Sequence, residues 1–267
     1  MMKISTCTDR SLLTPCGLDR FDYQLDPYIG CEHYCYYCYA LQYAETDWRQ
    51  EVQIHSDIEK RLVNELNDIT PQPIYIGYHS DPYQPCEAKC KQTHLALQML
   101  KNNDFSASFL TKSDLFLRDL DIISVMSDAS VSVSVSFKDD RTRALFEANT
   151  IDTKRRIEAL RATKRAGIRT RALLCPVIPY ISEPLNLLDQ LSDCADTIWI
   201  YGLSADKDNL SDLGWKNTRR ILADRFPDIA DRVERAVFSH NHPFWVQLRE
   251  EIEDFNHTRK LDLRIHI

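Results

Sequence analysis

The sequence predicts an α/β fold built on a parallel sheet. Short apolar runs alternate along the chain with helical patterns, which is typical of parallel strands covered by helices. Hydrophobic residues make up 43% and charged residues 27% of the 267 residues, a globular balance that can build a sizeable core. No apolar run reaches the ~18 residues of a membrane span. The pattern fits either a barrel or an open layer.

Six segments have the character of buried strands. The first, FDYQLDPYI, leads into a cysteine-rich loop. The others are, in chain order, Pro73 to Tyr78, Ser106 to Thr111, Val131 to Phe137, Ile168 to Cys175 and Thr197 to Gly202. In VSVSVSF the valines and serines alternate, so Ser132, Ser134 and Ser136 should share one face of the sheet. Serines that face a barrel lumen would suit a polar cofactor.

Helical patterns separate these strands. One helix begins with Ser56 and Glu59, which have the spacing of a capping box. Another runs from Asp152 to Gly167, a residue type that commonly ends helices. Further helices are expected over Lys89 to Leu100, after Ser113 and after Pro184. The alternation of strand and helix supports the parallel sheet.

After Leu203 the pattern changes. SADKDNLSDLG, residues 204–214, predicts a loop, and helices and the short alternating tail LDLRIHI follow it. We divide the chain into an N-terminal segment of residues 1–20, a barrel domain of residues 21–203 and a C-terminal extension of residues 204–267 that packs on the barrel. The N-terminus has no apolar signal core, so we expect a cytoplasmic protein with no membrane contact. Nine cysteines in that compartment favour metal or redox chemistry over disulfides.

The charge of the chain is uneven. Its net charge is −7, yet the segment from Lys138 to Arg171 has eleven Lys or Arg against five Asp or Glu. Such a basic segment could meet phosphates, with Arg155, Arg156 and Lys164 as candidates, or it could be a solvated helix face. On a barrel this helix should lie on the outer ring, far from the mouth. We therefore do not favour a nucleic-acid partner.

Three cysteines, Cys31, Cys35 and Cys38, stand within eight residues directly after the first predicted strand. A structural zinc site needs four protein ligands, and His33 is a poor fourth because it lies between the cysteines in the same short loop. Iron–sulfur clusters are held by thiolates, and three thiolates leave one iron of a four-iron cluster open. An open metal position can bind a substrate or cofactor, so the loop predicts a reactive cluster.

The spacing CxxxCxxC, with an aromatic residue, Tyr37, before the last cysteine, resembles the hallmark of the radical S-adenosylmethionine (SAM) superfamily. YIGCEHYCYYCYA, SDPYQPCE, LTKSDLFLRDLDII, RIEALRATKRAGI and CPVIPY further resemble the branch that contains spore photoproduct lyase. The resemblance runs from about Phe21 to Tyr201. It implies a partial (β/α)6 TIM-like barrel with a helical C-terminal extension, and chemistry at the carboxyl ends of the strands.

The resemblance implies that the three cysteines hold a [4Fe–4S] cluster whose open iron binds SAM. One electron from a reductant such as flavodoxin or ferredoxin then yields a 5′-deoxyadenosyl radical, which abstracts hydrogen from an unidentified substrate. The reaction would be of a lyase or oxidoreductase type. One alternative is nucleic-acid repair or modification in the manner of the lyase, and another is a non-catalytic iron–sulfur or zinc protein. The lyase has a hydrogen-donating cysteine at a position that matches Tyr78 here, which weakens the repair alternative.

The resemblance also suggests residues that bind SAM. Tyr37 would flank the adenine, Ser80 and Asp81 would bind the methionine amino group, Lys112 would meet the carboxylate, and Ser134 would make a further contact. Asp-Pro sequences also favour turns, so a purely structural role for the Ser80 segment stays open. The alternatives are that Lys112 is a surface lysine at a strand-to-helix turn and that Tyr37 is a packing aromatic.

Two further groups of cysteines carry hypotheses. Cys175 shares a strand face with Arg171 and, if that face looks inward, could donate a hydrogen atom to a product radical. The opposite register would place Thr170, Ala172 and Leu174 inside and leave Cys175 structural. A second metal site would use Cys86, Cys90 and His94, spaced along one stripe of a predicted helix, together with Cys7 or Cys16. Buried free cysteines are the alternative.

Overall fold

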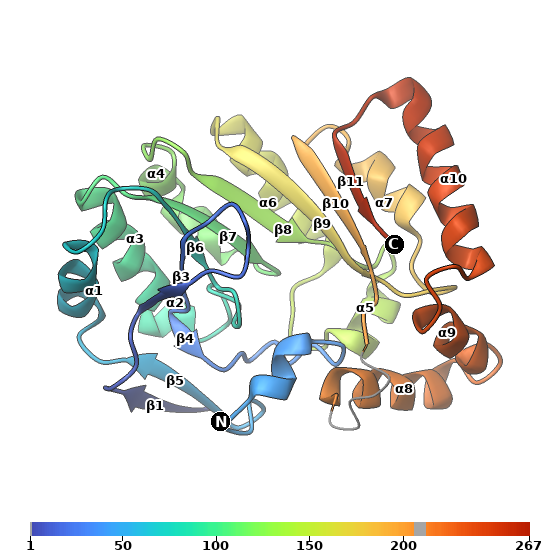
Figure 1. Ribbon diagram of the computed structural model, residues 1–267, viewed down its shortest axis with the longest axis horizontal. Helices are drawn as coiled ribbons and strands as arrows, with labels where there is room; N and C mark the ends of the chain where they lie inside the picture. Colours follow the sequence, from blue (N-terminus) through green and yellow to red (C-terminus); the bar gives the residue numbers. More distant parts are fainter. Residues whose placement is uncertain (1, 206–211) are drawn as a thin grey trace.

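The main sheet of the computed structural model, which describes residues 2–205 and 212–267, has eight strands (Figure 1). Their order is β11-β10-β9-β8-β7-β6-β3-β2, and every neighbouring pair is parallel except β2 with β3. The strands are β2 (Leu13–Pro15), β3 (Tyr23–Leu25), β6 (Pro73–Ile76), β7 (Ser106–Thr111), β8 (Ser130–Ser134), β9 (Arg169–Val177), β10 (Thr197–Gly202) and β11 (Leu263–His266). The sheet stays open at β2 and β11, which confirms the predicted α/β fold with a partial barrel of parallel strands.

The predicted first strand divides into two. β3 joins the main sheet, whereas β4 (Tyr28–Ile29) pairs with β5 (Glu51–His55) in a second sheet of order β1-β5-β4, in which β1 is Lys3–Cys7. The chain breaks at Asp26 and Pro27, because proline has no N–H to donate to a strand ladder. This break turns the chain toward the cysteine loop.

The outer face of the main sheet is covered by helices, and Figure 1 shows α3, α6 and α7 on the same side of it. The helices are α1 (Ile58–Leu66), α3 (Gln92–Asn102), α6 (Thr153–Arg165), α7 (Pro184–Leu191) and α10 (Pro243–Arg259). Val131 and Val133 of β8 and Leu174 of β9 are buried in the same core as Leu160 of α6. Because side chains alternate along a strand, Ser132 and Ser134 lie on the opposite, concave face.

The remaining elements lie around the carboxyl ends of the strands or complete the crossovers. They are α2 (Glu87–Cys90), α4 (Leu120–Ile123), α5 (Asp140–Phe146), α8 (Leu213–Arg225), α9 (Ala230–Val237) and the 3-10 helices η1 (Tyr39–Tyr43) and η2 (Leu115–Asp119). Residues 206–211 of the predicted loop lie outside the described residues, and α8 already begins at Leu213. The helices of residues 213–259 confirm the predicted helical extension. Its tail adds a strand to the main sheet, because β11 pairs in parallel with β10.

Two helix predictions are wrong in detail. Asp57, at φ 48°, stands before α1 without a side-chain cap, so Ser56 and Glu59 form no capping box. The predicted helix from Lys89 is interrupted at Lys91, at φ 55°, which separates α2 from α3. Gly167, at φ +76°, ends α6 as predicted. Within the described ranges, no helix combines the length and apolar character needed to cross a membrane.

Candidate active site at the cysteine loop

The cysteine loop begins at Gly30, directly after β4. Gly30 has φ +96°, and a Cβ placed there would lie 3.1 Å from Cδ1 of Trp48. Glycine is therefore needed both for its conformation and for the close approach of the indole ring. The loop then passes Cys31, Cys35 and Cys38 and enters η1 at Tyr39.

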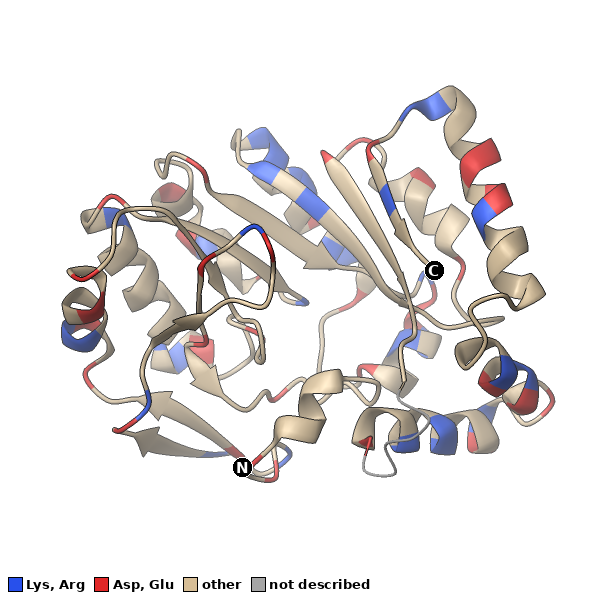
Figure 2. Cartoon of the chain, in the orientation of Figure 1, with Lys and Arg blue, Asp and Glu red and all other residues tan. Residues whose placement is uncertain are grey.

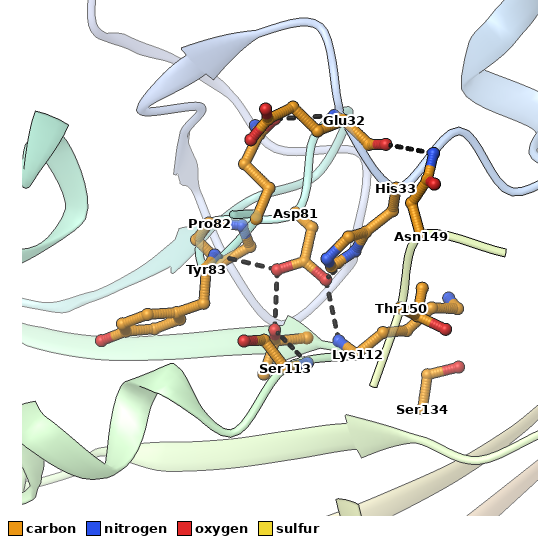
Figure 3. A network of polar contacts seen from close by, with 12 residues as sticks. Glu32, His33, Asp81, Pro82, Tyr83, Lys112, Ser113, Ser134, Asn149 and Thr150 are labelled. Atoms are coloured by element: carbon orange, nitrogen blue, oxygen red, sulfur yellow. Dashed lines mark hydrogen bonds and ion pairs between the residues drawn. The ribbon is translucent and has the colours of Figure 1, made fainter. Parts of the chain in front are cut away.

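Polar side chains from two distant segments hold the loop backbone. The Gln84 side chain donates to the carbonyl of Gly30 at 3.0 Å and accepts from the N–H of Glu32 at 2.8 Å. Asn149 donates to the carbonyl of Glu32 at 3.0 Å (Figure 3). The Glu32 carboxylate in turn accepts from the N–H of Cys86. The loop is thus fixed to the segments after β6 and after α5.

Asp81 joins three segments at the carboxyl ends of the strands (Figure 3). Its carboxylate accepts from the N–H of Tyr83 at 2.8 Å, the hydroxyl of Thr111 at 2.7 Å and the N–H of Lys112 at 2.8 Å. Nδ1 of His33, from the cysteine loop, lies 3.2 Å from Oδ2. Burial raises the pKa of Asp81, but His33 and the hydrogen bonds outweigh burial and lower it to about 2. This carboxylate is an anion that fixes the turn, the role that the Asp-Pro sequence also allowed.

A cavity of about 120 Å³ lies against the loop. Its lining includes Cys31, Cys35, Tyr37, Cys38, Ser80, Asp81 and Lys112. The structure therefore brings together most of the residues that the sequence proposed for the cluster and for SAM. The Ser80 hydroxyl is buried and has no hydrogen-bond partner within the described part of the chain. A buried hydroxyl without a partner costs free energy, so this atom is suited to a ligand in the cavity.

The Lys112 amine belongs to this site and is not a surface group. It lies 5.7 Å from the centre of the Tyr37 ring. Burial lowers the pKa of Lys112, but the neighbouring Cys35 and Glu147 raise it above its usual value. The site therefore contains a partly buried ammonium group beside the thiols, where a carboxylate ligand would be stabilised.

The three thiols have the chemistry of cluster ligands. Burial raises the pKa of Cys31 to about 12, with a further contribution from Asp81, and burial also raises the pKa values of Cys35 and Cys38. Buried thiols lose their protons when a metal centre binds them. Among the described residues, no three His, Cys, Asp or Glu side chains converge as ligands of a single metal ion do. A four-iron cluster requires no such convergence, because each thiolate binds a different iron, and three soft donors around one cavity fit that group.

Cys175 faces the site. Ala172 and Leu174 of β9 are buried in the helix-covered core, so Cys175 lies on the concave face with Arg171. Burial raises the pKa of Cys175 to about 11, while the positive charge of nearby Lys112 lowers it. This settles the register that the sequence left open.

Ser134 lies beside the same strand. Its hydroxyl donates to the carbonyl of Cys175 at 3.3 Å, and the Ser136 hydroxyl donates to the same oxygen at 2.6 Å. The two serines thus connect the end of β8 to β9 on the concave side.

A buried ion pair beneath Tyr37 was not foreseen from the sequence. Nη2 of Arg156 lies 2.6 Å from Oε2 of Glu147, and both side chains are at most 1% exposed. The Tyr37 hydroxyl donates to the other oxygen of Glu147. The pair therefore positions an aromatic residue of the cysteine loop. Glu147 stands in no recognisable motif, so the sequence carried no signal for this role.

Asp26 and His79 form a second unforeseen pair beside the cavity. Oδ2 of Asp26 lies 2.9 Å from Nδ1 of His79, and Oδ1 accepts from the backbone N–H groups of His79 and Ser80. Asp26 thereby holds the segment after β6, in which Ser80 lies. The signal was present in the sequence as an Asp-Pro pair that ends the first strand.

The second metal site is not formed. The break at Lys91 takes His94 off the stripe of Cys86 and Cys90. The His94 ring is engaged by Asp119, at 2.7 Å from Nδ1, and by Gln98 at Nε2. Cys86 packs with Tyr28 and Val52 instead.

The basic segment is largely neutralised by ion pairs. Arg155 pairs with Asp114 at 2.7 Å and Lys164 with Asp196 at 3.3 Å. Arg156 is buried, so its sequence-based assignment to a phosphate-binding surface is wrong. The helix α6 is rich in Lys and Arg, but it therefore presents few unpaired positive charges to solvent.

Comparisons with known proteins relate this architecture to others. No family model matches the sequence. The chain is 31% identical over 177 residues to an uncharacterised protein of Methanocaldococcus jannaschii, a match that covers 64% of this chain and 66% of that protein. It is 28% identical over 183 residues to an uncharacterised protein of Mycobacterium tuberculosis, covering 64% of this chain and 54% of that protein. The chain thus spans slightly under two thirds and about half of the length of these curated relatives.

Solved structures show what the fold is. A spore photoproduct lyase double mutant with bound AdoMet and dinucleoside spore photoproduct superposes with a TM-score of 0.65 and 15% identity, covering 98% of this chain and 81% of that chain. Streptococcus suis SuiB bound to S-adenosylmethionine superposes with a TM-score of 0.57 and 12% identity, covering 93% and 51%. Both neighbours are radical SAM enzymes. The chain therefore shares the fold of these two proteins.

Proposed function

We propose that the protein is a radical SAM enzyme in which Cys31, Cys35 and Cys38 hold a [4Fe–4S] cluster. The observation that supports this most directly is the gathering of three thiols and a partly buried ammonium group around one cavity. The cavity lies at the carboxyl ends of parallel strands, where barrels of this kind carry their chemistry. When bound, the cluster and SAM supply a 5′-deoxyadenosyl radical that abstracts hydrogen from a substrate.

Each residue around the cavity then has a role. The Lys112 ammonium binds the SAM carboxylate through a charge-assisted hydrogen bond. The Ser80 hydroxyl, which has no hydrogen-bond partner among the described residues, and Ser134 bind polar groups of SAM. Tyr37, fixed by its hydroxyl, flanks the adenine. Asp81 already accepts three hydrogen bonds, so it acts by positioning Ser80 and Lys112.

Cys175 is the candidate for a direct part in the reaction. Its thiol lies within electrostatic reach of Cys38 and Lys112, on the face that looks into the site. A thiol there can donate a hydrogen atom to a product radical. The reaction would be of a lyase or oxidoreductase type, with a one-electron reductant such as flavodoxin or ferredoxin as partner. The nine cysteines form no disulfide, which fits a reducing compartment such as the cytoplasm.

Nucleic-acid repair is the second candidate function. One structural neighbour carries a dinucleoside spore photoproduct, and this observation alone favours repair. Against it, Arg155 and Lys164 on the basic helix are paired with carboxylates. A non-catalytic iron–sulfur or zinc protein is the third candidate, and the lack of a converging ligand set among the described residues speaks against zinc.

The proposal is tested by anaerobic reconstitution followed by reduction with dithionite. We expect brown protein with about four irons per chain, and 5′-deoxyadenosine after SAM is added. Cys35→Ala should lose both, because two thiolates cannot hold the cluster firmly. Cys194→Ala is a matched control, since this cysteine is also buried but packs near the end of α7. Unchanged iron content and colour in Cys35→Ala would refute the cluster assignment.

A further inference from the structure

Three aromatic rings lie parallel on the concave side of β10 and β11. The planes of Trp199, Tyr201 and His266 are within 7° of one another. Their ring centres are 4.6 Å apart for Tyr201 and His266, 5.6 Å for Trp199 and His266, and 6.0 Å for Trp199 and Tyr201. We call these three residues the aromatic platform. Their alignment follows from the parallel register, in which Tyr201 stands opposite His266.

The platform faces away from the helices. Ile198 and Ile200, which alternate with its members along β10, are at most 1% exposed within the core beneath α7 and α10. Trp199 and Tyr201 are only half-buried, and His266 on the edge strand is exposed. In Figure 1 the helix α7 lies behind these strands. The three rings stack on one another, and a planar group can extend such a stack at a ring face that is still open.

Positive charge adjoins the platform on β9. Arg171 pairs in register with Thr197, two residues before Trp199, and its guanidinium donates to the Ser130 hydroxyl at 3.0 Å. Within residues 2–205 and 212–267 Arg171 forms no ion pair, whereas Arg20 and Arg169 share one carboxylate, that of Asp128. Figure 2 shows the basic residues along β9. Burial and the charges of Arg20 and Arg169 lower the pKa of Arg171, against an opposing contribution from Asp128. An anion bound here would offset part of this positive charge.

The platform is continuous with the proposed reaction site. Leu174 pairs in register with Ile200, so Cys175 and Tyr201, the next residue on each strand, lie on neighbouring strands of the concave face. Burial and the Cys175 thiol both raise the pKa of Tyr201. Along this face, from the cysteine loop outward, come Cys175, the platform and then Arg171. A molecule bound across the platform would therefore present one end to the reaction site and the other to uncompensated positive charge.

We propose that the aromatic platform and Arg171 bind the substrate, and that the substrate carries a planar aromatic ring with an anionic group. The ring extends the stack formed by Trp199, Tyr201 and His266, and the phosphate or carboxylate pairs with the Arg171 guanidinium. This inference names the substrate class of the proposed function and rests on it for the reaction. The binding itself does not require the cluster.

The test measures binding to the anaerobically prepared protein by titration calorimetry. The ligands are thymidine 5′-monophosphate, indole-3-acetate, thymidine and inorganic phosphate, so that a nucleotide and an aromatic carboxylate are distinguished as sources. Trp199→Ala and His266→Ala should each weaken the binding of aromatic anions, about fivefold to a hundredfold. Arg171→Gln should weaken the monophosphate about tenfold to a hundredfold and leave thymidine unchanged. Val246→Ala, on the exposed side of α10, should change nothing.

Several results would overturn the proposal. These are no binding of either aromatic anion at millimolar concentration, unchanged affinity in both platform variants, and inorganic phosphate binding as tightly as the monophosphate. Weaker binding by His266→Ala would not be explained by misfolding, because this side chain is exposed on an edge strand. Cys35→Ala should bind the same ligands as the wild type. If no 5′-deoxyadenosine forms but aromatic anions still bind through the platform, the proposed radical SAM function is refuted and the proposed binding site is supported.

Discussion

Two neighbouring arginines on α6 provide a matched pair for testing how the cysteine loop is held. Arg156 is 1% exposed and its guanidinium bonds to the Glu147 carboxylate, the carbonyl of Ser134 at 3.0 Å and the carbonyl of Ile151 at 3.1 Å. Arg155 is 56% exposed and pairs with the partly buried carboxylate of Asp114. The two substitutions remove the same side chain from one helix, so a difference between them reports on burial.

Arg156→Ala should lower the free energy of unfolding by about 3–5 kcal/mol, because it leaves the Glu147 carboxylate buried without its partner. Arg155→Ala should cost at most about 1 kcal/mol, since an exposed pair gains little in water. Each kcal/mol shifts the melting temperature by roughly 2–4 °C in a domain of this size. Arg156→Ala should thus melt on the order of 10 °C lower.

The assay is thermal and urea unfolding of the wild type and both variants, prepared side by side without oxygen. Arg156→Lys should fall between the wild type and Arg156→Ala, because lysine keeps the charge but loses the planar set of donors. Iron content is measured on the same samples, and Arg156→Ala should retain less because Tyr37 loses its fixed partner. The reasoning is refuted if Arg156→Ala is no less stable than Arg155→Ala.

Three further predictions follow from the site and its surroundings. Lys112→Ala should weaken SAM binding about tenfold to a hundredfold at unchanged iron content; wild-type affinity would remove Lys112 from the SAM site. Undamaged duplex DNA should bind no tighter than ~10 μM at physiological salt; submicromolar, salt-steep binding would restore the repair candidate. The hydrogen bond to Asp26 raises the pKa of His79, so the stabilisation by protonated His79 is complete below the unfolded pKa of about 6.5 and is lost as pH rises through the folded value. The gap in melting temperature between the wild type and His79→Gln should therefore be larger at about pH 6 than at about pH 8; an equal gap would contradict this.

Much of the fold could be predicted because local patterns agree with tertiary structure. β7 and β10 have the predicted bounds, since each is a short apolar run enclosed by polar turns. Lys112 and Ser80 could be placed near the cysteines because the carboxyl ends of parallel strands meet at one edge of a sheet. The first strand was less predictable, because one proline divides it between two sheets.

The buried ion pair of Arg156 and Glu147, which holds Tyr37 of the cysteine loop, could not be predicted from the sequence. Arg155 and Arg156 are adjacent residues of one type, and only the packing of α6 on β8 buries one and exposes the other. The same applies to Glu147, whose role depends on Tyr37, 110 residues earlier in the chain. Charged residues are rarely buried, so a prediction from composition alone would place both Arg156 and Glu147 at the protein surface.

The placement of positive charge also bears on how a substrate would approach. The outer helix α6 is basic in sequence, yet Arg155, Arg161 and Lys164 are paired with carboxylates. The concave face shows the reverse: Arg171 has a hydroxyl partner and no ion pair among the residues that the structure describes. A long polyanion would need many free cations on an accessible outer surface, whereas a small anion needs a single oriented guanidinium beside a surface that holds its apolar part. The distribution of charge therefore favours a compact substrate bound inside the half-barrel over a duplex bound along its outside.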